Sequence, residues 1–140
     1  FTGVARAAFD MALQYCHERK QGGQLLIDNQ LTRFRLGDML RRVELCRGVA
    51  RRSLAYARQT PHGHAYATAS AKVTITQECM QVVDEALQLF GGAGLSREYA
   101  IEKLYRDARA ALIEDGENRV LTMRLGVLAQ QLYAEGWSQN

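Results

Sequence analysis

Two long stretches of the chain repeat apolar residues at every third or fourth position, and this pattern limits the possible folds more than any other feature. The first runs from about Asp28 to Gln59, and the second ends at Phe90. This spacing places the apolar side chains on one face of an α-helix. The chain's single proline, Pro61, lies between the two stretches. The sequence therefore predicts two long helices joined by the short turn at residues 60–63, which makes them antiparallel neighbours.

Shorter stretches with the same periodicity predict three more helices, at residues 4–20, 96–107 and 117–133. Glycines mark the breaks between helices, and Asp28 or Asn29 can cap the second helix. We expect Ser96 to cap the short helix that follows, and Asp115 or Asn118 to cap the last one. No segment alternates with a period of two over a useful length.

These elements predict an all-α fold, an antiparallel up-down four-helix bundle with an extra short helix. Residues 1–134 are expected to form one domain, and residues 135–140 a polar tail. The chain starts in helical rhythm without an initiator methionine, as a fragment of a longer protein would.

Composition narrows the classes of partner. The net charge of +3 is small and dispersed, which argues against nucleic acid. No apolar run reaches the ~18 residues that a membrane span requires, and the three separated cysteines suit a reducing compartment. A cytoplasmic location is therefore expected. The three histidines lack metal-ligand spacing, so no metal site is predicted.

Two groups of residues between Gln88 and Asn118 allow either a structural or a functional interpretation. The glycines at Gly91 and Gly92 suit the end of a helix, but they would also let a phosphate approach the backbone. The acidic turn at residues 114–118 suits the start of a helix, where carboxylates offset the helix dipole. A carboxylate there could instead act as a general base, provided that a dry cleft raises its pKa.

Three segments together resemble a known family. They are ALQYCHERKQGGQLLIDNQ (residues 12–30), EALQLFGGAGLSREYAIEKLYRDAR (residues 85–109) and the IEDGEN turn (residues 113–118). In this order they closely resemble the carboxyl-terminal helical domain of acyl-CoA dehydrogenases, over nearly the whole chain.

The resemblance implies an FAD-dependent enzyme that removes two hydrogens across the α,β bond of an acyl-CoA or acyl-carrier thioester. A carboxylate takes the α-proton and the flavin accepts the β-hydride. The resemblance also implies FAD bound between subunits, a homo-oligomer (dimer or tetramer) held by the bundle, and an electron-transfer partner. The 140-residue chain alone is expected to bind FAD weakly or not at all and to be inactive.

Site residues follow from the same resemblance. Arg19 matches the arginine that binds the FAD diphosphate, a task that suits the guanidinium fork. Gln88, Gly91 and Gly92 match the segment that approaches the adenosine half of FAD. Three further positions are assigned to cofactor binding on the same basis: Gln30, Glu117 and Asn118.

The chain departs from the family pattern at two positions. Gly22 stands where the family has phenylalanine, and Asp115 stands at the position of the catalytic glutamate. Aspartate is one methylene shorter, and a misplacement of ~1 Å can cost on the order of a hundredfold in rate. The base is therefore Asp115, Glu114 or a carboxylate upstream of Phe1, or the complete protein catalyses a different reaction. The alternative function is a non-catalytic helical assembly module derived from this family.

Overall fold

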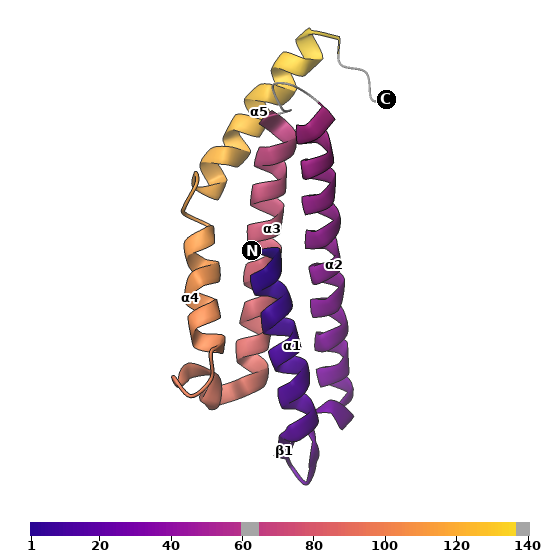
Figure 1. The fold of residues 1–140 in the computed structure, drawn as a ribbon, viewed down its shortest axis with the longest axis vertical. Helices are drawn as coiled ribbons and strands as arrows, with labels where there is room; N and C mark the ends of the chain where they lie inside the picture. Colours follow the sequence, from indigo (N-terminus) through magenta and orange to yellow (C-terminus); the bar gives the residue numbers. More distant parts are fainter. Residues whose placement is uncertain (60–64, 137–140) are drawn as a thin grey trace.

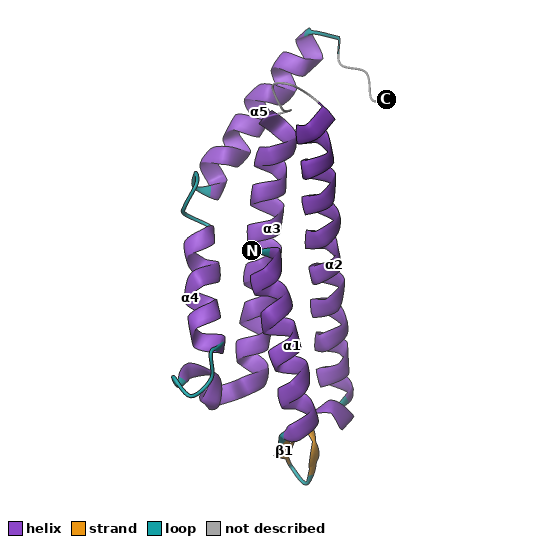
Figure 2. Cartoon of the chain, in the orientation of Figure 1, coloured by secondary structure: helices purple, strands orange, loops and turns teal. Residues whose placement is uncertain are grey.

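The computed structural model describes residues 1–59 and 65–136, and most of these residues are helical (Figures 1 and 2). In chain order the elements are α1 (Thr2–Glu18), β1 (Lys20–Gln21), β2 (Gln24–Leu25), η1 (Leu26–Asp28), α2 (Gln30–Gln59), α3 (Ala65–Phe90), η2 (Gly91–Leu95), α4 (Ile101–Ala111) and α5 (Asn118–Ala134). The predicted all-α fold is confirmed. The predicted turn at residues 60–63, with His62, and the neighbouring His64 lie outside the described residues.

The helices α1, α2, α3 and α4 alternate in direction (Figure 1). The other three pack around α3. The short helix α4 runs back along α3 and also contacts α1. The helix α5 continues in nearly the direction of α4 and covers the half of α3 that includes its first residues (Figure 1). Small and medium apolar side chains fill the centre, among them Met39, Val43 and Val82, which are fully buried. The last helix is thus an extension of the bundle rather than a returning member.

A two-residue β-hairpin joins α1 to α2, an element that the periodicity did not predict. Lys20 pairs with Leu25, and Gln21 with Gln24. The turn residues Gly22 and Gly23 have φ angles of 62° and 84°. Residues other than glycine rarely adopt this left-handed backbone conformation, so a phenylalanine at position 22 would be strained in this turn. The hairpin gives a local reason for Gly22.

Side-chain caps confirm one predicted helix start and correct two others. The Asn29 side chain accepts a hydrogen bond from the Leu31 N–H at 2.8 Å, as a cap of α2 should. The prediction that Ser96 caps the short helix was wrong, because Ser96 forms a turn with Ala93 and Glu98 and α4 begins only at Ile101. At α5 the cap is Glu117, not Asp115 or Asn118.

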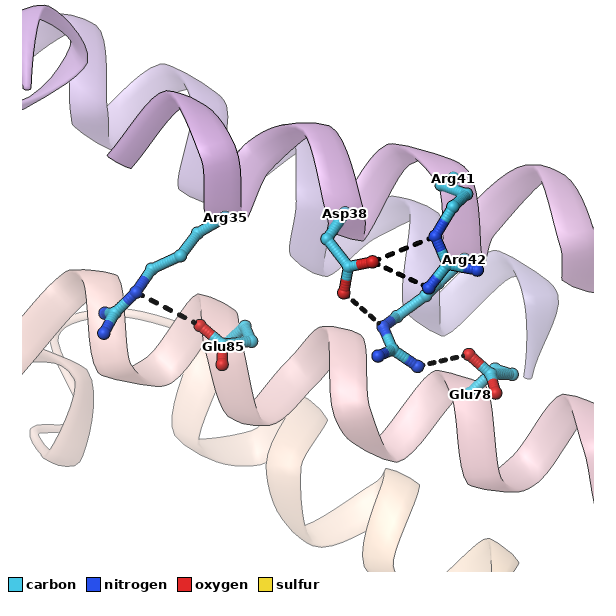
Figure 3. A network of polar contacts seen from close by, with 6 residues as sticks. All are labelled: Arg35, Asp38, Arg41, Arg42, Glu78 and Glu85. Carbon is cyan, nitrogen blue, oxygen red and sulfur yellow. Dashed lines mark hydrogen bonds and ion pairs between the residues drawn. The ribbon is translucent and has the colours of Figure 1, made fainter. Parts of the chain in front are cut away.

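Ion pairs cross the seam between α2 and α3 (Figure 3). The Arg42 guanidinium lies 2.6 Å from a carboxylate oxygen of Asp38 on its own helix and 2.6 Å from one of Glu78 on α3. Its side chain is only 23% exposed. Bonds from Arg41 and Arg42 hold the pKa of Asp38 below its usual value. Arg42 therefore connects two partly buried carboxylates across the seam.

The three cysteines are free thiols, buried one each in α1, α2 and α3. Burial raises the pKa of Cys16 and of Cys46, and raises that of Cys79 to about 11. Buried, weakly acidic thiols of this kind act as packing residues rather than as reactive groups. Among the described residues no helix is both long and apolar enough to cross a bilayer.

Candidate functional site

A cavity of about 490 Å³ opens at the end of the bundle where α1 and α3 finish. Its walls come from the end of α1, the hairpin, the last turn of α3 and η2. The lining residues are Tyr15, Arg19, Gln21, Leu26, Gln88, Leu89, Phe90, Gly91, Gly92 and Ala93. Four predicted cofactor-binding residues, Arg19, Gln88, Gly91 and Gly92, thus line one cavity although they are about seventy positions apart in sequence.

The backbone fixes Arg19 at the mouth of this cavity. As the residue that ends α1, it donates its N–H to the Tyr15 carbonyl at 2.8 Å and accepts from the Leu26 N–H at 2.9 Å. Its side chain is exposed and, within residues 1–59 and 65–136, makes no hydrogen bond or ion pair. A guanidinium with five donors and no partner among the described residues is suited to bind an anion.

Stacked aromatic rings join the end of α1 to the end of α3 beneath the cavity. The rings of Tyr15 and Phe90 lie 4.1 Å apart with an interplanar angle of 21°. The ring of Tyr99 meets Tyr15 and Phe90 edge-on, at 5.7 Å and 5.0 Å. Such contacts stabilise by about 0.5–1.5 kcal/mol each beyond burial. The cluster keeps Arg19 beside the glycine segment.

The glycines that follow α3 differ in what they require. Gly91 has a φ angle of 59°, a backbone conformation that residues other than glycine rarely adopt. This conformation ends the helix, as predicted. At Gly94 an added Cβ would lie 2.9 Å from the Leu87 oxygen and 2.9 Å from the Phe90 Cβ, so packing requires glycine. Gly92 has neither restriction, because an added Cβ would meet nothing within 4 Å. Gly92 is also one of the residues that line the cavity.

Gln30 does not line this cavity. It is the exposed first residue of α2. A second, smaller cavity of about 370 Å³ around the hairpin reaches its neighbour Asn29 and shares Gln21 and Leu26 with the first. Gln30 therefore lies next to the candidate site but outside its walls.

The acidic turn lies at the other end of α4. With 11 residues, α4 is roughly 16 Å long at 1.5 Å per residue. Asp115 and Glu114 are both exposed, and neither carboxylate has a partner in the described part of the chain. The dry cleft that a general base needs is not supplied by these residues. Asp115 has φ 54° and Gly116 φ 101°, so the backbone at the turn is held in a sparsely populated conformation.

Glu117 and Asn118 make structural contacts at this turn. A Glu117 carboxylate oxygen accepts from the N–H groups of Arg119 and Val120 at 2.9 Å and 3.1 Å, and these two bonds lower the Glu117 pKa. Asn118 is 6% exposed and points inward, toward Thr76 and Lys72 on α3. The structure does not bring either residue to the Arg19 cavity.

Sequence reasoning missed the residues of α3 and α1 that support the two regions. Tyr15 carries a signal only as part of an apolar face, and Lys72 and Thr76 lie more than forty positions before the turn they contact. Among the described residues, no group of three histidine, cysteine, aspartate or glutamate side chains could hold a metal ion.

The fold and the cavity define a helical domain with an exposed arginine and two glycines lining a cavity at one end. The chain matches the family model "Acyl-CoA dehydrogenase, C-terminal domain" over residues 1–129. This protein therefore belongs to the acyl-CoA dehydrogenase family, as the resemblance indicated.

Individual relatives agree with this assignment. The probable acyl-CoA dehydrogenase FadE25 of Mycobacterium tuberculosis is 33% identical over 118 residues, which cover 84% of this chain and 30% of the relative. Cyclohexane-1-carbonyl-CoA dehydrogenase of Geobacter metallireducens is 31% identical over 133 residues, covering 95% and 34%. The structure of butyryl-CoA dehydrogenase from Megasphaera elsdenii superposes with a TM-score of 0.85 at 32% identity, covering 92% and 33%. The chain thus spans about a third of the length of these relatives.

Proposed function

We propose that this chain is the carboxyl-terminal domain of an FAD-dependent dehydrogenase that desaturates the α,β bond of an acyl-CoA or acyl-carrier thioester. Membership of the family supports the reaction class. The observation that carries the proposal is the Arg19 cavity, where a guanidinium without a partner among the described residues lines the same space as Gly91 and Gly92.

The residues of the cavity fit FAD. The Arg19 fork can donate two parallel hydrogen bonds to a diphosphate, and the Gln88 amide can donate to or accept from the adenosine half. The open space at Gly92 lets a ligand approach the backbone closely. FAD, when bound, supplies the acceptor for the β-hydride. Gln30, Glu117 and Asn118 remain proposed contacts, Gln30 from beside the cavity and the other two from the turn.

Asp115 is the proposed base. Its carboxylate takes the α-proton, and the electron pair of that C–H bond becomes the second bond between the α and β carbons. Because Asp115 is exposed in this chain, other parts of the complete protein would have to exclude water from it. Glu114 is the alternative within this turn.

The exposed face of α5 supports a homo-oligomer, dimer or tetramer, formed through the bundle. Val120, Met123 and Val127 lie at helical spacing and are 42%, 67% and 52% exposed. Exposed apolar groups on one helix face are typical of an interface. The remaining parts of the proposal are an electron-transfer partner, a cytoplasmic location, a role in fatty acid metabolism, and a division into a domain at residues 1–134 and a tail at 135–140.

The same face supports the second candidate, a helical assembly module without catalysis. The exposure of Asp115 and the presence of Gly22 are compatible with it. The two candidates share the interface and differ in flavin binding and turnover.

The test uses the complete protein that contains this chain. A dehydrogenase will carry stoichiometric flavin, and an acyl-CoA added without oxygen will bleach the flavin spectrum. Asp115→Asn is expected to abolish bleaching while flavin stays bound, and Glu114→Gln is expected to leave it. Full bleaching by Asp115→Asn would remove Asp115 as the base, and a protein without flavin would favour the assembly module. The isolated 140-residue chain is expected to bind FAD weakly or not at all and to catalyse nothing.

A further inference from the structure

Lys72, in the first third of α3, connects that helix to the turn that carries Asp115. Its ammonium group donates to the Gly116 carbonyl at 2.7 Å and to the Asn118 side-chain oxygen at 2.7 Å. These are charge-assisted bonds, which are stronger than neutral ones. The carbonyl that Lys72 binds belongs to the residue directly after Asp115.

Thr76, one helical turn further along α3, holds the other side of Asn118. The Asn118 side-chain N–H donates to the Thr76 hydroxyl oxygen at 2.9 Å, and that hydroxyl donates to the Lys72 carbonyl at 2.9 Å. Thr76 is 1% exposed and Asn118 is 6% exposed. Because water has little access to these groups, each lost bond would leave a buried polar atom without a partner.

The backbone that these bonds hold is a strained one. Asp115 is the only residue other than glycine with a positive φ in the described chain, and it is followed by Gly116 at φ 101°. Such conformations persist only where surrounding contacts enforce them, and they set the direction of the side chain. No side chain within the turn provides such contacts to Gly116, whereas Lys72 does.

We propose that Lys72 is a positioning residue for the reaction, which fixes the direction of the Asp115 carboxylate by binding the Gly116 carbonyl and, together with Thr76, Asn118. The proposal rests on the proposed function, in which Asp115 is the base. Asp115 is shorter than the glutamate of its relatives, so its carboxylate depends more strongly on where the turn is held.

The experiment compares Lys72→Met and Lys72→Arg in the complete, flavin-loaded protein, with Lys103→Met as the matched control. Lys103 is an exposed lysine on α4 whose one ion-pair partner among the described residues is Asp107. Lys72→Met is expected to lower kcat by about 10- to 100-fold with KM and flavin content unchanged. Lys72→Arg is expected to recover most of kcat, and Lys103→Met to keep it. Hydrogen exchange followed by mass spectrometry should show faster exchange in Lys72→Met at residues 112–118 and no change in the cavity segment.

A kcat of Lys72→Met equal to that of the wild type would overturn the proposal. So would a general loss of structure, seen as loss of flavin, a raised KM and faster hydrogen exchange throughout the domain. If Lys72→Met does not fold, Thr76→Val removes the Asn118 partner without altering the charge and should lower kcat less, again at constant KM. An unchanged kcat in that folded variant also overturns the proposal. Asp115→Asn, measured in parallel, separates a failure of the proposed function from a failure of the role of Lys72. If Asp115→Asn retains activity, the assignment of Asp115 as the base fails. If Asp115→Asn is inactive while Lys72→Met is active, only the role of Lys72 fails.

Discussion

Three alanine substitutions after α3 test whether the structure separates conformational, packing and ligand requirements for glycine. In Gly91→Ala the new side chain must adopt φ 59°. In Gly94→Ala the new Cβ meets the Leu87 oxygen and the Phe90 Cβ, both at 2.9 Å. In Gly92→Ala it meets nothing within 4 Å and points into open space.

The expected changes in the free energy of unfolding follow from these differences. The left-handed conformation costs alanine about 1–2 kcal/mol, which is partly offset by about 0.4–1 kcal/mol from a less flexible unfolded chain. Gly91→Ala should therefore lose roughly 0.5–1 kcal/mol. Overpacking should cost Gly94→Ala about 1–3 kcal/mol, because neither neighbouring atom can swing aside. Gly92→Ala should gain up to about 1 kcal/mol.

Urea unfolding of the complete protein and FAD titration of its flavin-free form together decide the matter. The decisive variant is Gly92→Ala, whose stability should hold or rise while its FAD affinity falls, since the methyl group is added at a residue that lines the cavity. Unchanged FAD affinity in this variant would refute the inference that a ligand approaches Gly92. A large loss of stability in Gly92→Ala would refute the assignment of its neighbourhood as open.

Three further predictions concern single charges. Arg19→Ala should raise the FAD dissociation constant by at least about ten- to a hundredfold, because the loss of a single charge-assisted bond already costs about 1.5–3 kcal/mol, and it should leave the urea midpoint unchanged. Arg51→Ala, which removes an exposed arginine of α2, should change neither quantity. Arg42→Met should lower the free energy of unfolding by about 1–3 kcal/mol, because Asp38 and Glu78 lose their shared partner. The control Arg41→Met changes a side chain that is 59% exposed and should cost less than about 0.5 kcal/mol in the same urea assay. Equal losses in the two variants would contradict this prediction. Folding lowers the Glu117 pKa, so the stability that this cap contributes is fully present above the unfolded pKa of roughly 4.3. That stability is lost as the pH falls through the lower pKa of the folded state. The difference in urea midpoint between wild type and Glu117→Gln should therefore shrink from pH 7 to pH 3.

Periodicity located the long helices well because burial of one face, repeated over many residues, dominates their energetics. The predicted helices at 4–20, 28–59 and 117–133 lie within about one turn of α1, α2 and α5, and the helix predicted to end at Phe90 ends there as α3. The hairpin was missed because two-residue strands have no measurable period. Ser96 was misassigned because a serine hydroxyl serves a turn as well as it caps a helix.

The candidate site was less accessible to sequence reasoning than the fold. Arg19 and Gln88 come together only through the packing of α1 on α3, which no local pattern encodes, and the family resemblance was needed to pair them. The inward turn of Asn118 depends on Lys72 and Thr76 across the bundle. A side chain expected to face a cofactor thus has its polar groups engaged by α3.

The buried thiols provide an intrinsic record of how the bundle opens. Cys16, Cys46 and Cys79 lie on three of the helices that form the core, and their raised pKa values keep them as unreactive thiols near neutral pH. A thiol-specific reagent can label each one only while its helix is exposed to solvent. Three labelling rates, resolved by mass spectrometry of the peptides, would show whether α1 separates from α2 and α3 before the bundle unfolds as a whole.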